Sequence, residues 1–255
     1  MKKSVFITML DKDEGLAKLL FQEMDRYGLA PGGHFWTDDL PGLAWSAPIP
    51  ELANDNCGCW VIVGQAARFK DKATRQGLSC LALAAQAAHG HGFPILLSPS
   101  GGKLDAATLP TPLKGAEVVA SGLGVKAVAK ANARRQQEPQ EYRLDMHPLP
   151  GLGFWLEVGP GRDPWRGAML GACGAVPDAH GVGPAGAIPQ NSTLHYPVRG
   201  MKLELGGAQY EAWGVQNELS MADSYYVRLS GTPESLVFGA FPDDDEVSVF
   251  TVSFT

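Results

Sequence analysis

The stretch from Cys57 to Gly102 constrains the fold more than any other part of the chain, because its apolar residues change from strand spacing to helix spacing and back. Residues 60–63 (WVIV) form a continuous apolar run, which is typical of a strand buried on both faces. Residues 74–88 place apolar side chains at helical spacing, and residues 93–97 form a second apolar run. The stretch therefore predicts a strand, a helix and a second strand, for which a right-handed parallel crossover is the default.

Similar patterns flank this stretch and extend it into a domain. Residues 4–10, 33–37 and 116–120 have the pattern of three further strands, and residues 14–27 and 125–137 that of helices. Five strands alternating with helices favour a three-layer α/β domain with a parallel sheet. We therefore predict an N-terminal flavodoxin-like parallel five-stranded three-layer domain over residues 1–138, with the strand order 2-1-3-4-5.

Beyond residue 138 the chain changes in both charge and hydropathy pattern. Residues 1–138 carry 15 Lys and Arg against 13 Asp and Glu, whereas residues 139–255 carry 6 against 14. The second part has alternating apolar runs, and Gly206-Gly207 between two of them is a hairpin signal. We predict a C-terminal antiparallel β-sandwich or barrel-like domain over residues 139–255, with strands at residues 142–146, 154–158, 198–205, 208–215, 225–229, 236–240 and 247–254.

Residues 159–197 interrupt this β-rich pattern with many Gly and Pro residues. We interpret them as a long Gly/Pro-rich insertion that contains a short helix over residues 165–172. A structureless loop of this length is uncommon in a compact domain unless it is functional or disordered. If the chain is an enzyme, this segment is expected to cap the active site.

The overall charge and the apolar runs argue against several classes of protein. The net charge is −6 and the isoelectric point is near 5.5, which argues against a nucleic-acid partner. No apolar run approaches the roughly 18 residues of a membrane span, and the N-terminal run is too short for a secretion signal. The four cysteines lack the spacing of a metal or redox pair, so we expect free thiols. These features predict a cytoplasmic protein with no membrane partner.

Polar residues follow the predicted strands where each strand ends. In a parallel α/β sheet these carboxyl ends form the edge at which ligands bind. The turn SPSGGK offers backbone N–H groups, two hydroxyls and an ammonium to an anion, although it lacks the spacing of a P-loop. A tight Gly/Ser turn without a ligand is the alternative explanation. The candidate ligand-binding residues are Asp11, Asp13, Gln65, Ser98, Ser100, Gly101, Gly102 and Lys103.

A second candidate group lies within residues 159–197. Asp178, His180 and His195 are of residue types that act as acids, bases or metal ligands. Their spacing matches no ligand pattern, and histidines in loops are usually solvated, so we predict no metal site. The sequence identifies no cofactor and no catalytic residue.

The N-terminal domain resembles a response-regulator receiver domain. Residues 6–20 (FITMLDKDEGLAKLL) place acidic side chains at the end of the first strand, and Ser98 stands where a receiver carries a hydroxyl. The resemblance implies a flavodoxin-like fold. The third strand ends at Gln65 without the Asp that receivers phosphorylate, and Ser121 replaces the Lys of the fifth strand, so phosphotransfer is not expected. TIR-type domains share the strand count, and residues 45–52 are similar to their segment before the third strand.

The sequence favours a two-domain binding or regulatory/accessory protein without a phosphoacceptor Asp in its α/β domain. Its partner would be a small anionic ligand or another protein, and an edge strand in either domain would allow a homo-oligomer. The alternative is a hydrolase or transferase acting on a nucleotide or phosphorylated small molecule at the strand ends. In that case Asp11, Ser98 and Lys103 would surround one deep pocket.

Overall fold

The computed structural model describes residues 2–134, 140–242 and 249–255. The chain divides into two compact units, which are described separately below. The α/β unit comprises Met1–Leu40 and Ala44–Gln137, and the β unit comprises Pro41–Leu43 and Glu138–Thr255.

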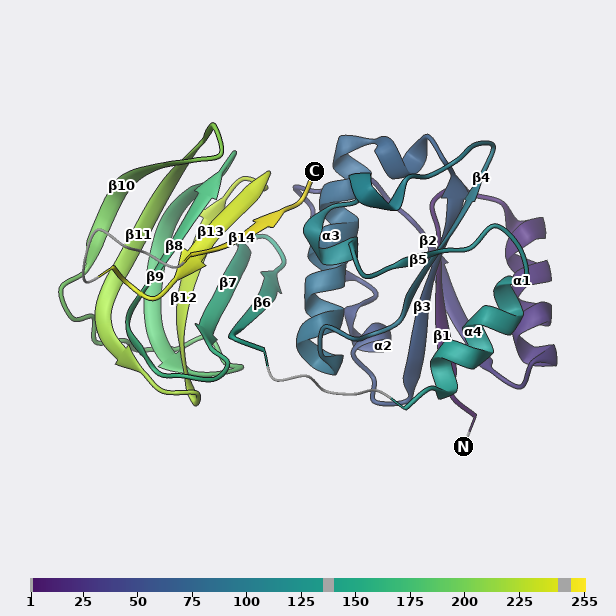
Figure 1. The fold of residues 1–255 in the computed structure, drawn as a ribbon, viewed down its shortest axis with the longest axis horizontal. Helices are drawn as coiled ribbons and strands as arrows, with labels where there is room; N and C mark the ends of the chain where they lie inside the picture. The colour runs from purple at the N-terminus through teal and green to yellow at the C-terminus, as the bar shows by residue number, and fades with distance from the viewer. Residues whose placement is uncertain (1, 135–139, 243–248) are drawn as a thin grey trace. The chain divides into compact units, whose positions relative to one another are not determined.

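The α/β unit is built on one parallel sheet with the strand order β2-β1-β3-β4-β5 (Figure 1). This order confirms the predicted flavodoxin-like arrangement, and it reverses direction between β1 and β3. The central strand β3 is buried along its whole length except for its last residue, as its continuous apolar run predicts. The strands are β1 (Ser4–Met9), β2 (Ala30–Phe35), β3 (Cys57–Gln65), β4 (Ile95–Ser100) and β5 (Glu117–Val118).

Helices cover both faces of this sheet and complete three layers (Figure 1). α1 and α4 lie on one face, and α2 and α3 lie on the other. The side chain of Asp13 caps the first turn of α1, and that of Asp71 caps α3. The helices are α1 (Glu14–Arg26), α2 (Ile49–Leu52), α3 (Lys72–His89) and α4 (Leu123–Asn132), with short 3₁₀ turns at Ala44–Ser46, Arg68–Lys70, Ala106–Thr108 and Thr111–Leu113.

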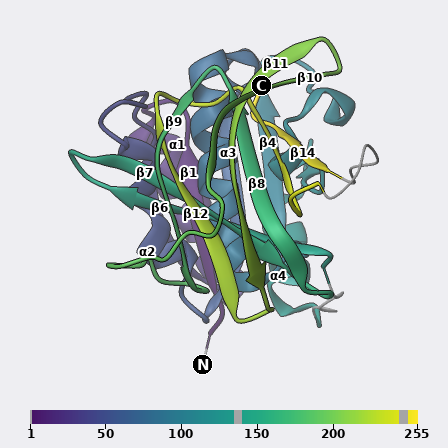
Figure 2. The ribbon, with the colours of Figure 1, turned by 90° about the vertical axis from the view of Figure 1, so that its left-hand side faces the viewer.

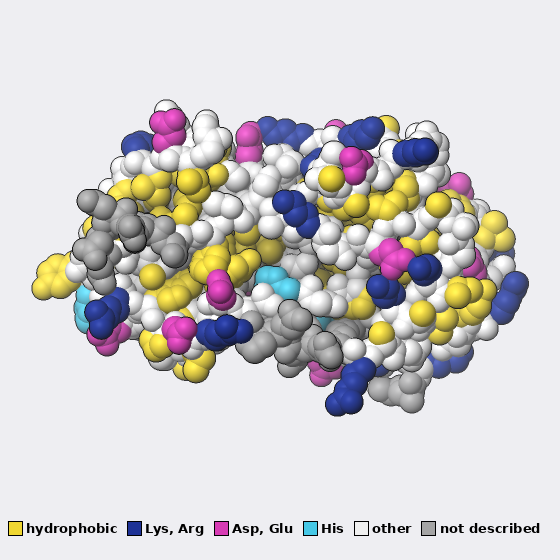
Figure 3. Space-filling view, in the orientation of Figure 1, with side chains coloured by type: hydrophobic (Ala, Val, Ile, Leu, Met, Phe, Trp, Pro, Cys, Tyr) yellow, Lys and Arg dark blue, Asp and Glu magenta, His cyan; other side chains and the backbone are white. Residues whose placement is uncertain are grey.

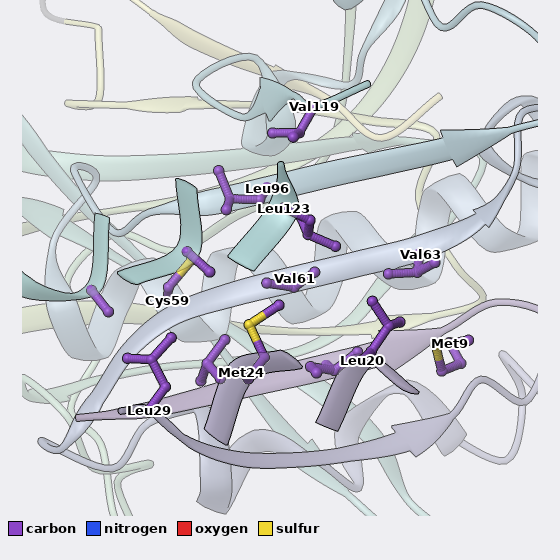
Figure 4. Close-up of a cluster of buried hydrophobic side chains, with 14 residues drawn as sticks. Met9, Leu20, Met24, Leu29, Cys59, Val61, Val63, Leu96, Val119 and Leu123 are labelled. Carbon is purple, nitrogen blue, oxygen red and sulfur yellow. The ribbon is translucent and has the colours of Figure 1, made fainter. Parts of the chain in front are cut away.

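A buried apolar cluster joins the sheet to α1 and α4 (Figure 4). Met24 of α1 and Ala127 of α4 are fully buried against Ile7 of β1 and Val61 of β3. Complete burial of a Met, Ile or Val side chain stabilises the folded state by about 1.5–3 kcal/mol. The apolar spacing that predicts α1 and α4 therefore also determines which face of each helix meets the sheet.

The β unit consists of two antiparallel sheets that pack face to face as a sandwich (Figure 1, Figure 2). One sheet has the order β10-β11-β8-β13-β14, and the other has the order β6-β7-β12-β9. The ring of Tyr142 lies 5.0 Å from that of Phe238 and 4.5 Å from that of Phe250, which links the two sheets. The strands are β6 (Tyr142–Leu149), β7 (Gly153–Pro160), β8 (Trp165–Cys173), β9 (Val176–Pro184), β10 (Val198–Leu205), β11 (Ala208–Leu219), β12 (Asp223–Ser230), β13 (Ser235–Gly239) and β14 (Phe250–Ser253).

The interpretation of residues 159–197 as one long insertion with a short helix is wrong. The segment contains two strands, β8 and β9, and β8 is the middle strand of its sheet. Glycine interrupts the apolar pattern of β8. Gly171 is required there because a Cβ at this position would lie 2.8 Å from the Cβ of Ala212 on β11. Gly183 on β9 similarly leaves room for Pro189. Small residues are needed at these close approaches, and they remove the alternation of apolar side chains by which strands are predicted.

Parts of two predictions lie outside the described residues. The predicted strand 247–254 appears as β14, but residues 247 and 248 are not described, and neither are residues 135–137 of the last predicted helix.

No helix among residues 2–134, 140–242 and 249–255 is long and apolar enough to cross a membrane. On the face drawn in Figure 3, Lys and Arg side chains are interspersed with Asp and Glu rather than gathered into a basic stripe.

Candidate functional site

The carboxyl ends of β1, β3 and β4 meet at one edge of the parallel sheet and bring several predicted residues together. The carboxylate of Asp11 accepts a hydrogen bond of 2.8 Å from the backbone N–H of Gln65. Gln65 is paired in register with Ser100, and the hydroxyl of Ser100 lies 3.4 Å from the carbonyl oxygen of Gly64. A Cβ at Gly102 would lie 3.2 Å from Ala66, so the turn after β4 packs directly against the end of β3.

The other predicted residues of this edge differ in their hydrogen bonds and in their exposure to solvent. Asp13 is committed to the helix, because its carboxylate accepts the backbone N–H of Leu16 at 2.8 Å. Ser98 is partly buried within β4, whereas Gly101 and Lys103 are exposed in the turn that follows. Gly101 has a φ of +66°, a backbone conformation that favours glycine. No carboxylate among the described residues pairs with Lys103.

Arg68 and Asp38 also belong to this edge, and sequence reasoning missed both. The Arg68 guanidinium lies 2.5 Å from Asp38 and 3.9 Å from Asp11. Asp38 accepts further hydrogen bonds from the indole of Trp36 at 2.8 Å and the hydroxyl of Thr74 at 3.0 Å. Burial favours a higher pKa for Asp38, but the hydrogen bonds from Arg68, Trp36 and Thr74 outweigh it and lower the pKa. Asp38 is therefore ionised and holds Arg68 in place.

A cavity of about 310 Å³ lies at the other end of the sheet, beside the start of β4. Its lining includes Phe93, Ile95 and Glu117, and Glu117 is paired there with Lys126 and Lys130 at 2.7 and 3.1 Å. None of the residues predicted for the ligand-binding edge lines this cavity.

The second predicted group, Asp178, His180 and His195, is dispersed over the β unit. Asp178 of β9 forms an ion pair of 2.7 Å with Arg228. His180 forms a hydrogen bond with the hydroxyl of Tyr225. Tyr225 and Arg228 are three positions apart on β12, so their side chains lie on opposite faces of the sheet. His195 is exposed in the irregular segment between β9 and β10, with its backbone N–H bonded to Asn217. The three residues therefore contact three different partners.

His180 belongs instead to a cluster between the two sheets. Its Nδ1 lies 2.8 Å from the Tyr225 hydroxyl, and its Nε2 accepts a hydrogen bond of 3.3 Å from Arg199. The imidazole meets the Trp213 ring edge-on at 4.9 Å, and the Arg199 guanidinium lies 4.9 Å from the same ring. Burial, together with the charge of Arg199, lowers the pKa of His180 to about 4, so the ring is neutral.

A second polar cluster lies on the face of the four-stranded sheet that points away from the other sheet. Glu157 of β7 is almost completely buried there, 4% exposed. One carboxylate oxygen accepts the Ser224 hydroxyl at 2.7 Å and the backbone N–H of Gly186 at 2.8 Å. The other oxygen lies 2.7 Å from Nε2 of His147, which in turn lies 3.9 Å from the carboxylate of Asp145. We call Asp145, His147 and Glu157 the strand triad.

The protonation states of the strand triad follow from its burial and its contacts. Burial lowers the pKa of His147, but the hydrogen bond to Glu157 and the charge of Asp145 outweigh it and raise the pKa. Burial raises the pKa of Asp145, although the charge of His147 opposes this. The hydrogen bonds to Glu157 outweigh burial and lower its pKa. Sequence reasoning missed this triad, because the predicted strand 142–146 ended before His147; β6 continues to Leu149, and the spacing Asp-x-His places both side chains on one face of it.

No protein-family model matches the chain, and a search of curated proteins finds no significant match to it.

Proposed function

We propose that the chain is a two-domain binding protein of the regulatory or accessory kind, and that its α/β unit binds a small anionic ligand at the carboxyl edge of the parallel sheet. The observation that carries the proposal is the state of the acidic groups at this edge. Asp11, Asp13 and Asp38 each accept hydrogen bonds from the protein itself. A general base needs a carboxylate oxygen that is directed toward the proton it removes, whereas these carboxylates orient groups of the protein itself.

The donors at the same edge support binding of an anion. The exposed turn that carries Gly101, Gly102 and Lys103 offers backbone N–H groups and an ammonium group. The guanidinium of Arg68 lies beside the end of β3, and two carboxylates fix its position. A phosphate or carboxylate ligand that meets both cations would gain charge-assisted hydrogen bonds, which are about twice as strong as neutral ones.

The alternative, a hydrolase or transferase at this edge, is less well supported by the same residues. One oxygen of Asp11 accepts the N–H of Gln65, and the other lies 3.9 Å from the Arg68 guanidinium. Asp38 is held in its ionised form by three donors. The second candidate function therefore needs a catalytic group from carboxylates that already serve as acceptors within the protein, whereas the binding proposal does not.

The proposal is tested by thermal unfolding of the purified chain in the presence of anionic small molecules. The panel consists of inorganic phosphate, citrate, nucleoside mono- and triphosphates and sugar phosphates. At least one of them should raise the melting temperature in a concentration-dependent way, since a ligand at 100 times its Kd stabilises the folded state by about 2.7 kcal/mol.

Matched variants test whether the ligand binds at this edge. Lys103→Gln and Arg68→Gln should reduce the ligand-induced shift, whereas Lys114→Gln, at an exposed lysine in a different loop, should retain it. Absence of any shift across the panel, or a shift that Lys103→Gln and Arg68→Gln leave unchanged, would contradict the proposal. Turnover of a phosphorylated compound by the wild type, abolished by Asp11→Asn, would favour the enzyme alternative.

A further inference from the structure

We propose that the strand triad of the β unit, Asp145, His147 and Glu157, binds a divalent first-row transition-metal ion. This site lies in a different unit from the anion-binding edge, so the two proposals stand or fall separately. It also goes beyond the sequence prediction, which contained no metal site.

The backbone register brings the three ligand groups together. Asp145 and Glu157 are directly opposite each other on β6 and β7, and His147 follows Asp145 by two positions on the same face. One ligand atom from each of the three residues lies within 4.8 Å of the others. Metal–ligand bonds of roughly 2.0–2.2 Å require neighbouring ligand atoms to be about 3–3.5 Å apart. The distances of 2.7 and 3.9 Å from His147 Nε2 to the two carboxylates need only small side-chain rotations to reach that range.

The charges at this position favour a cation. Two carboxylates directly opposite each other on adjacent strands repel and destabilise the pair. A divalent ion that takes the place of a proton on Nε2 of His147 would balance both carboxylates. Arg143, the cationic residue two positions before Asp145, is held by backbone carbonyl oxygens of Pro160, Met221 and Asp223. Its guanidinium reaches Glu157 only through the hydroxyl of Ser224, at 3.0 Å.

The surroundings of Glu157 orient its carboxylate. Ser224 and the N–H of Gly186 occupy one oxygen, which leaves the other directed at His147. Gly186 belongs to the chain that follows β9, and the next residue, Ala187, donates its N–H to the hydroxyl of Tyr226 at 3.1 Å. Burial and the charge of Glu157 raise the pKa of Tyr226 to about 12, so this hydroxyl stays neutral. Outer hydrogen bonds of this kind fix the ligands of known metal sites.

The donor set identifies the class of metal. One imidazole nitrogen with two carboxylate oxygens suits Zn²⁺, Mn²⁺, Fe²⁺ or Co²⁺ better than Mg²⁺ or Ca²⁺, which prefer oxygen ligands alone. The side chains of Asp145 and His147 are 32% and 20% exposed, which leaves room for water or a further ligand on the ion. Three protein ligands and an open position are typical of a catalytic rather than a purely structural site.

Metal titration of the chelator-treated full chain tests the proposal, with Zn²⁺ and Co²⁺ as the probes. Isothermal titration calorimetry should show one equivalent of Zn²⁺ bound with a Kd below about 10 µM. Co²⁺ should give visible absorption bands that Zn²⁺ abolishes. Asp145→Asn and His147→Gln change partly exposed side chains, so the variants should fold, and each should weaken Zn²⁺ binding by at least ~10-fold.

Two further kinds of variant separate a built site from incidental binding. Ser224→Ala leaves the three ligands in place but frees one oxygen of Glu157, and it should weaken Zn²⁺ binding by about 10-fold. His91→Gln and Asp163→Asn remove exposed groups elsewhere and should leave affinity unchanged. The proposal is overturned if the wild type binds no Zn²⁺ or Co²⁺ at one equivalent. Equal affinity in His147→Gln, with folding confirmed by circular dichroism, would also overturn it.

Discussion

The carboxylate of Asp11 at the end of β1 accepts the backbone N–H of Gln65 at the end of β3, with a separation of 2.8 Å. These two strands lie on either side of the point where the strand order of the sheet reverses. In folds of this type the crevice at that point is the usual ligand site. The bond between Asp11 and Gln65 joins the two strand ends at that point, and the Arg68 guanidinium lies 3.9 Å from the Asp11 carboxylate.

Removing this carboxylate should loosen the edge without unfolding the unit. Asp11→Ala deletes an acceptor for the N–H of Gln65 and should lower the free energy of unfolding by about 1 kcal/mol. Asp11→Asn keeps an acceptor oxygen and should cost less. Urea unfolding followed by circular dichroism measures both. Asp25→Ala serves as the control, because its ion pair with Lys2 is exposed and should be worth less than ~0.5 kcal/mol. Equal losses in Asp11→Ala and Asp25→Ala would contradict this account.

Thr8 is the acceptor for a tryptophan in the interior of the parallel sheet. The indole N–H of Trp60 donates to the Thr8 hydroxyl at 2.9 Å, and both residues are fully buried. Nε2 of His34 lies 3.0 Å from the same hydroxyl. Thr8→Val keeps the volume but leaves the indole without a partner, so it should destabilise the protein by roughly 1–3 kcal/mol. The exposed Thr251→Val should change stability by less than about 0.5 kcal/mol. Full tolerance of Thr8→Val in urea unfolding would refute the assignment.

Two helical glycines should respond to alanine in opposite directions. A Cβ at Gly77 of α3 would lie 2.6 Å from the ring of Trp36, which is buried and has little room to move. Gly77→Ala should therefore destabilise the protein by about 1–3 kcal/mol despite the better helix propensity of alanine. A Cβ at Gly15 of α1 would meet only an oxygen of Asp13 at 3.4 Å. Gly15→Ala should stabilise by up to ~1 kcal/mol. Changes of the same sign in melting temperature would disprove this reading of the packing.

His180 should make the stability of the β unit depend on pH. Its pKa is 6.5 in the unfolded chain and about 4 in the folded protein. Between these values the unfolded chain binds more protons, so the stabilisation is complete above pH 6.5 and is lost as the pH falls toward 4. After allowance for partial exposure, the loss should be about 1–3 kcal/mol.

The variant His180→Gln isolates this contribution. It should lower stability at pH 7 and flatten the decline between pH 6.5 and 4, measured by urea unfolding across that range. His195→Gln, at an exposed histidine in the same unit, should keep the wild-type slope. An unchanged slope in His180→Gln would show that another group is responsible for the decline.

The fold of the α/β unit could be predicted because its signals are local. The buried run of β3 and the helical spacing of α3 both appear in consecutive residues, and the caps at Asp13 and Asp71 are typical helix starts. The β unit was predicted less completely. Its strands β8 and β9 contain glycines required by neighbours such as Ala212 and Pro189, which are far away in sequence. The local pattern therefore indicated a long insertion with a short helix over residues 165–172 where the sheets continue as β8 and β9.

Parts of the candidate sites could likewise be predicted from the sequence, and other parts could not. The strand ends of a parallel sheet lie at one edge by topology alone, so Asp11, Gln65 and Ser100 could be grouped from the sequence. The partner of Arg68 could not, because Asp38 is 30 positions away and no local spacing relates them. Likewise, Asp145 and His147 share a face by alternation, but their approach to Glu157 depends on the register between β6 and β7.

The sequence by itself determined the main helices and strands of the α/β unit and which residues end its parallel strands, because periodicity and capping act over a few residues. The tertiary structure decided which polar groups meet. It directed two carboxylates of the α/β unit, those of Asp11 and Asp38, to partners far away in sequence, and it placed a buried glutamate beside a histidine and an aspartate on a neighbouring strand. Such meetings depend on strand register and on close approaches between distant segments, which no local pattern encodes.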